Sequence, residues 1–90
     1  MIALFADLLL GGARLKDIYC ELDQESPKPG SHEWVLSGRI RLSRSQTEQL
    51  QADRTYRLQM ADGRAGQVVL DSIPSTNESI DVVVPFKPQA

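Results

Sequence analysis

The stretch YRLQMADGRAGQVVL, residues 56–70, indicates the fold class. Apolar and polar residues alternate through most of it, and a period of two is typical of β-strands with one buried face. Asp62 and Gly63, near its middle, favour a reversal of the backbone. The stretch therefore predicts an antiparallel hairpin, and the length of the hairpin loop decides which side chains face the core.

The loop length follows from the residues that have to share the buried face. A loop of two residues, 62–63, puts Val68 on the same face as Arg57. A loop of three residues, 61–63, shifts the pairing by one residue, and Gly63 suits the left-handed position that such loops contain. The longer loop, which we predict, places the large apolar residues of both strands on one face: Tyr56, Leu58, Met60, Val68 and Leu70.

Five segments in all are expected to be strands: 18–23, 34–42, 56–61, 66–73 and 80–86. The apolar run 68–70 is consistent with a strand that is covered on both faces. Residues 24–33, QESPKPGSHE, contain two prolines and a glycine and are expected to form a loop. The last strand is expected at an open edge of the sheet, where Pro85 and Pro88 would blunt strand addition.

The N-terminal stretch MIALFADLLLGG is apolar but lacks the features of a targeting signal. No Lys or Arg precedes Arg14, and Asp7 interrupts the apolar residues, whereas a secretory signal begins with basic residues. The stretch is also too short to span a bilayer. We assign it to the folded domain, either as an edge strand over residues 2–6 or as a short helix over residues 2–10 that ends at Gly11, and we favour the strand.

A short helix is expected before the hairpin. Ser45 and Glu48 have the spacing of a capping box, which predicts one or two helical turns over residues 46–51 on the surface. The predicted fold is a single, mostly β domain over residues 1–90: a small antiparallel barrel or sandwich of five to six strands with one short helix. This element order is also that of the OB-fold barrel, an analogy of fold that does not carry function.

The composition limits the classes of function. The 90 residues are enough for one core. A net charge of −2 at pH 7 and a pI of about 5.2 argue against binding of a polyanion by the molecule as a whole. Cys20 is the only cysteine, which excludes an intrachain disulfide and favours a reducing compartment such as the cytoplasm.

Arginine is concentrated in residues 34–70, which hold six arginines, no lysine and three acids, whereas residues 1–33 hold three basic and six acidic residues. Its guanidinium binds carboxylates and phosphates through a rigid fork. The candidate binding face consists of the arginines on or near the predicted strands: Arg39, Arg41, Arg44, Arg57 and Arg64.

Three interpretations of this face are open. The simplest is a solvated face on which the arginines pair with acids of neighbouring strands; a protein partner comes second and nucleic acid third. Binding of single-stranded nucleic acid usually requires outward aromatic residues for base stacking. Only Tyr19 is expected to point outward, because Trp34 and Tyr56 lie on the apolar faces of their strands.

Residues that support catalysis or metal binding are scarce. A single cysteine and a single histidine, His32, cannot assemble a Cys/His zinc site within one chain. Cys20 alternates with Ile18 and Leu22, so we expect it to behave as a small buried hydrophobe. The sequence therefore predicts no cofactor, no metal and no enzymatic activity.

The function is expected to lie in protein interaction or assembly. The N-terminal stretch has more apolar side chains than a short segment needs for its own burial, and the expected self-association residues are Ile2, Leu4, Phe5, Leu8 and Leu9. They are predicted to pack across a two-fold interface between identical chains. The alternative is binding of single-stranded nucleic acid or a phosphate ligand through the arginines; no contact with a membrane is expected.

Overall fold

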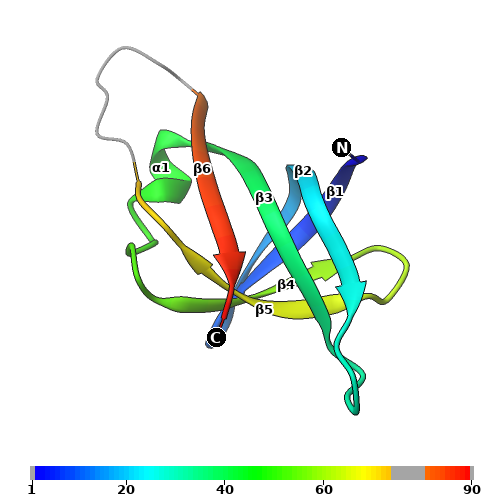
Figure 1. The fold of residues 1–90 in the computed structure, drawn as a ribbon. Coiled ribbons are helices and arrows are strands. Elements are labelled where there is room, and N and C mark those ends of the chain that lie inside the picture. Colours follow the sequence, from blue (N-terminus) through cyan, green and yellow to red (C-terminus); the bar gives the residue numbers. More distant parts are fainter. Residues whose placement is uncertain (1, 74–80, 90) are drawn as a thin grey trace.

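The computed structural model describes residues 2–73 and 81–89, which contain six strands and one short helix (Figure 1). The elements are β1 (Ile2–Leu10), β2 (Ala13–Pro27), β3 (Trp34–Ser43), α1 (Arg44–Thr47), β4 (Thr55–Met60), β5 (Ala65–Leu70) and β6 (Asp81–Pro88). The strands close into an antiparallel barrel in the order β1-β2-β3-β6-β5-β4, and β4 pairs with β1. The predicted small antiparallel β fold with one short helix is confirmed, and it is a barrel.

Closure of the barrel depends on β6. Helix α1 lies between β3 and β4, as in the predicted element order. The barrel has one strand more than the five of the OB-fold, because β6 lies between β3 and β5 and pairs with both. The expectation that the last strand forms an open edge was therefore wrong for the second half of β6, where residues 86–88 pair with β5, whereas residues 81–84 pair with β3 alone among the described strands.

The β4–β5 hairpin has the predicted three-residue loop. The N–H of Met60 donates to the carbonyl of Arg64 at 2.8 Å, and the N–H of Gly63 donates to the carbonyl of Met60 at 3.1 Å. Gly63 has a φ of 95°, in the region that favours glycine. Tyr56 lies opposite Val68, so the apolar residues of both strands face the core.

Buried side chains mostly alternate with more exposed ones along the strands, and the two sets form the inside and the outside of the barrel. The alternation is interrupted in β2 between Leu15 and Ile18, where the register with β1 shifts. Burying one large aliphatic or aromatic side chain stabilises the fold by about 1.5–3 kcal/mol. Val69 is half-buried between the buried Val68 and Leu70, so the prediction of a strand covered on both faces was wrong. Ile80, the first residue of the predicted last strand, lies outside the described residues.

The β2–β3 hairpin is longer than predicted. Residues 24–27, which were expected in the loop, pair with residues 34–37, so β2 continues to Pro27. The prolines and glycine of the segment lie at or beyond the end of β2, where a backbone N–H is not required by the ladder. The start of β3 then passes over β5, and a Cβ atom at Gly66 would lie 2.2 Å from the carbonyl oxygen of Trp34.

The N-terminal stretch is a strand, as favoured, but it is not an edge strand along its whole length. β1 pairs with β2 from Ile2 to Leu10, and its second half, from Ala6 to Leu9, also pairs with β4. In a closed barrel the second half of β1 has a neighbour on either side. Residues 2–5 of β1 pair with β2 alone.

Helix α1 begins two residues before the predicted position. Its N-cap is Ser43, whose Oγ accepts a hydrogen bond from the N–H of Gln46, while Oε1 of Gln46 accepts one from the N–H of Ser43. The capping box is therefore Ser43 with Gln46 and not Ser45 with Glu48. Ser43 is the last residue of β3 and has the extended backbone that an N-cap requires.

Candidate interaction surface

Outward side chains of four neighbouring strands form one row across the barrel wall. Phe5 of β1 lies opposite Tyr19 of β2, and Tyr19 lies opposite Arg41 of β3. Arg41 in turn lies opposite Val83 of β6. Residues directly opposite each other on antiparallel strands share a face of the sheet, so these four side chains are neighbours. We call them the Phe5 row.

Tyr19 contacts both Phe5 and Arg41 within the Phe5 row, and Phe5, Arg41 and Val83 are exposed. The rings of Phe5 and Tyr19 have their centroids 5.9 Å apart at an angle of 39°. The guanidinium carbon of Arg41 lies 5.3 Å from the centroid of the Tyr19 ring, within the range of a cation–π interaction. Phe5 is 64% exposed and Val83 is 43% exposed. The row therefore presents aromatic, cationic and aliphatic groups, and tyrosine and arginine are enriched at protein-interface hot spots.

Next to the row, Arg39 is bound to acids of β2. Its guanidinium donates to the two carboxylate oxygens of Asp23 at 2.9 and 3.3 Å and lies 3.6 Å from the carboxylate of Glu21. The hydrogen bond to Asp23 is the main cause of a raised pKa of Arg39. Arg39 therefore belongs to a carboxylate-paired surface, as the simplest interpretation of the arginines predicted.

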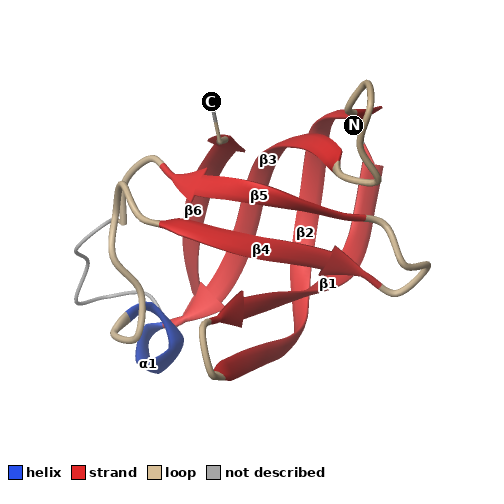
Figure 2. Ribbon diagram, turned by 90° about the horizontal axis from the view of Figure 1, so that it is seen from below, coloured by secondary structure: helices blue, strands red, loops and turns tan. Residues whose placement is uncertain are grey.

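The five candidate arginines do not form one face. β3 carries Arg39 and Arg41, and β4 carries Arg57; two strands separate β3 from β4 in either direction around the barrel, so their outward side chains leave opposite walls (Figure 2). Arg57 binds the carboxylate of Glu33 at 2.5 Å. Arg44 lies in α1 and also has an interaction partner. The single arginine face expected from the sequence is therefore absent, because barrel closure distributes the strands around a circle.

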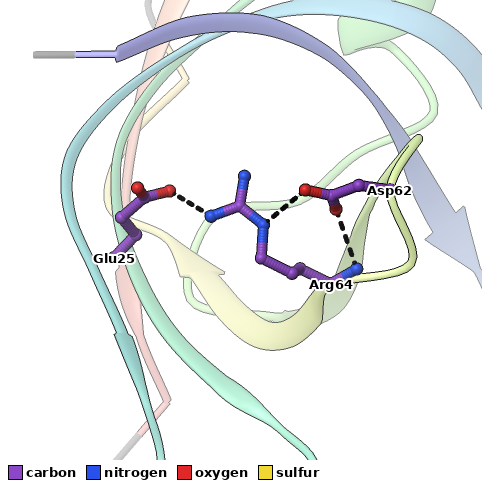
Figure 3. A network of polar contacts seen from close by, with 3 residues as sticks. All are labelled: Glu25, Asp62 and Arg64. Atoms are coloured by element: carbon purple, nitrogen blue, oxygen red, sulfur yellow. Dashed lines mark hydrogen bonds and ion pairs between the residues drawn. The ribbon is translucent and has the colours of Figure 1, made fainter.

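Arg64 joins the β4–β5 turn to the end of β2 (Figure 3). Its guanidinium donates to Glu25 at 2.5 Å and to Asp62 at 2.7 Å, and its backbone N–H donates to Asp62 at 3.0 Å. The backbone hydrogen bond from Arg64 is the main cause of a lowered pKa of Asp62, and the hydrogen bond to Glu25 is the main cause of a raised pKa of Arg64. The guanidinium carbon also lies 5.2 Å from the centroid of the Trp34 ring. These contacts give Arg64 a structural role.

The predicted self-association residues have different environments. Leu8 has no exposed surface and lies in the core, so its proposed role at an interface was wrong; every second residue of β1 faces the barrel interior. Leu4 is half-buried and packs against the core, and Leu9 is half-buried. Ile2 is 43% exposed, so Ile2 and Phe5 are the members of the set that present most surface.

A groove lies beside Phe5, between the first half of β1 and the β4–β5 turn. Its volume is about 330 Å³, and its lining residues are Leu4, Phe5, Met60, Ala61, Asp62 and Arg64. The sequence could indicate which side chains of β1 face inward and which face outward. The groove and the Phe5 row could not be predicted, because they depend on which strands become neighbours. The exposure of Phe5 also shows that the expectation of Tyr19 as the only outward aromatic residue was wrong.

The remaining chemical groups are separate from this surface. Cys20 is fully buried, and burial is the main cause that raises the pKa of its thiol to about 12. His32 is exposed in the turn between β2 and β3. Across residues 2–73 and 81–89, no three histidine, cysteine, aspartate or glutamate side chains gather as a metal site. Within the same ranges, no helix has the length and apolar character needed to cross a membrane.

Comparison of the chain with protein-family models, with curated proteins and with solved structures found no match.

Proposed function

We propose that this chain is a non-catalytic protein-interaction domain that self-associates through the surface around Phe5. The observation that carries the proposal is the exposure of Phe5, a large aromatic residue that is 64% exposed and lies between the ring of Tyr19 and the groove. An exposed aromatic residue on a wall of well-defined strands is the kind of anchor that dominates protein interfaces.

The charges of the molecule support a protein partner over a polyanion. The Phe5 row contains one cation, Arg41, and the adjacent row contains Glu21 beside Arg39. Asp23, Glu25 and Glu33 hold the arginines that could otherwise attract phosphates. The net charge of −2 also opposes the approach of nucleic acid.

The absence of catalysis is part of the proposal, and the state of the thiol supports it. A nucleophilic cysteine acts as a thiolate, which requires access and a low pKa. Cys20 has a raised pKa of about 12 and is fully buried, so at neutral pH it is a protonated thiol in the core.

Sedimentation velocity at high micromolar concentration tests self-association. The unchanged protein is expected to sediment as a dimer, and Phe5→Ser is expected to weaken the dimer by about tenfold or more, because truncating an aromatic anchor commonly costs more than 1 kcal/mol. Gln67→Ser is the control, since Gln67 is an exposed residue of β5 that lies outside both the Phe5 row and the groove. A monomeric wild type, or equal dimer stability for Phe5→Ser and the wild type, contradicts the proposal.

A second candidate is binding of single-stranded nucleic acid, which the neighbouring rings of Phe5 and Tyr19 and the cation of Arg41 favour. Two aromatic residues and an arginine on a sheet face are the components of a base-stacking platform. It predicts that a labelled oligonucleotide binds at low ionic strength, with an affinity that falls steeply with salt and is lost in Arg41→Ala. Arg54→Ala is the control, because Arg54 is an exposed arginine outside the row. No increase in fluorescence anisotropy at low salt excludes this candidate.

A further inference from the structure

The first half of β1 has one strand neighbour where the second half has two. β2 pairs with β1 along its length, whereas β4 pairs only with the segment from Ala6 to Leu9. β4 ends at Met60, and the chain turns towards β5. Within the part of the chain that the structure describes, no strand lies on the other edge of residues 2–5. This edge of β1 is open.

The hairpin shows which backbone groups of β4 point towards β1. The N–H of Met60 donates to the carbonyl of Arg64, the residue just before β5. The backbone groups of successive residues in an antiparallel strand point alternately to the two neighbours. The N–H and carbonyl of Gln59 therefore point to β1, where Gln59 lies opposite Asp7.

The same alternation identifies the free groups on β1. If the groups of Asp7 point towards β4, then those of Phe5 and Ala3, two and four residues earlier, point to the same side. On that side β4 has already ended. Ala3 and Phe5 thus offer their backbone N–H and carbonyl groups at the open edge, next to the groove.

The groove restricts what can add to this edge. Its two charged lining residues, Asp62 and Arg64, bind each other, and Arg64 also binds Glu25. The other lining residues, Leu4, Phe5, Met60 and Ala61, are apolar. An occupant therefore needs an extended backbone for the edge and uncharged, apolar side chains for the groove.

We infer that the open edge accepts residues 2–4 of a second copy of this chain as an added antiparallel strand. This inference rests on the proposed self-association and gives it a geometry. Residues 2–4 are Ile, Ala and Leu, which are uncharged, apolar and already extended. They lack the lysine and proline that protect natural edge strands from pairing. A two-fold axis beside the edge lets each copy satisfy the backbone groups of the other.

Ala3 lies at the centre of the predicted contact. β4 occupies the positions beside Ala6, and the turn begins at Ala61 near Phe5, so the free part of the edge is centred on Ala3. Its small, exposed side chain on the outer face allows two strands to meet there. A two-fold axis at Ala3 pairs Ile2 of each copy with Leu4 of the other.

Substitution of Ala3 tests the inference by sedimentation velocity. Ala3→Pro removes the N–H that points to the open edge, and no strand within the described chain uses that N–H, so the folded monomer is expected to remain. Its dimer is expected to weaken by about tenfold or more. Ala3→Ser keeps the N–H and is expected to dimerise like the wild type.

Three results contradict the inference, and they separate it from the proposed function. If Ala3→Pro dimerises like the wild type while Phe5→Ser does not, strand addition is wrong and the interaction surface stands. If the wild type is monomeric at high micromolar concentration, both are wrong. Hydrogen exchange of the Ala3 amide in the wild type provides a readout without any substitution: it is expected to slow as the protein concentration rises, and exchange that is independent of concentration contradicts strand addition.

Discussion

At the scale of single residues, Gly66 shows how one missing side chain permits the packing of the barrel. It lies opposite Leu58 on β4, and the carbonyl of Trp34 crosses directly over it. A Cβ atom there would be 2.2 Å from the Trp34 oxygen and 3.3 Å from a methyl group of Leu36. The first of these contacts is with backbone, which cannot rotate away, so a side chain at this position would push β3 off β5.

We expect Gly66→Ala to lower the free energy of unfolding by about 1–3 kcal/mol, the usual cost of overpacking a well-packed interior. Urea denaturation followed by far-ultraviolet circular dichroism measures the change. Gly12→Ala is the control, because a Cβ atom at Gly12 would meet nothing within 4 Å and the residue has no positive φ. Equal stability of the two variants would show that β3 does not press on β5 at Gly66.

The alternation of residues along the chain was sufficient to predict most of the buried side chains. Cys20 was predicted to be buried from its place between Ile18 and Leu22, and all three are in the core. The three-residue loop at residues 61–63 followed from the requirement that apolar residues share a face. Each of these predictions uses only residues that are close in sequence.

At the scale of elements, the start of α1 was predicted two residues late. Ser45 and Glu48 have the spacing of a capping box, but so do Ser43 and Gln46, and only the second pair lies where β3 ends. The length of β3 depends on its pairing with β6, where Ser43 still lies opposite Asp81. A partner that is distant in sequence thus decides where the helix begins, and the local pattern contains no information about it.

Substitution of the two serines distinguishes the two boxes. Ser43→Ala removes the N-cap hydrogen bond to the N–H of Gln46 and is expected to cost about 1 kcal/mol of stability. Ser45→Ala lies within α1, where alanine is a good helix former, and is expected to change stability much less. Thermal or urea unfolding of both variants measures the difference. A larger loss for Ser45→Ala would restore the predicted box.

At the scale of the whole molecule, the charge that is segregated along the sequence is joined in space. Residues 1–33 are acidic and residues 34–70 are basic. Folding places acids of the first segment on arginines of the second: Arg39 with Asp23, Arg57 with Glu33, and Arg64 with Glu25. The simplest interpretation of the arginines, pairing on a solvated surface, therefore describes these three. The sequence could not predict which acid meets which arginine, because the pairing depends on how the strands close into a ring.

The Glu25–Arg64 pair is expected to stabilise the closed barrel, because it connects the end of β2 to the β4–β5 turn. Both side chains are 25% exposed, so the pair is better shielded than Arg14 with Asp7, which are 45% and 26% exposed and 3.3 Å apart. Arg64→Gln is expected to cost about 1 kcal/mol, and Arg14→Gln less. A double-mutant cycle of Arg64→Gln with Glu25→Gln, followed by urea denaturation, measures the coupling. Additive effects of the two substitutions would show that the pair contributes nothing to closure.

Because Cys20 is buried, the reactivity of its thiol reports opening of the barrel. The thiol is the only one in the sequence and has no exposed surface, so a thiol-specific reagent can reach it only when strands separate. The rate at which the unchanged protein is labelled then measures how often the strands separate. A comparison of this rate between dilute and concentrated samples measures how much a second copy slows the opening of the barrel.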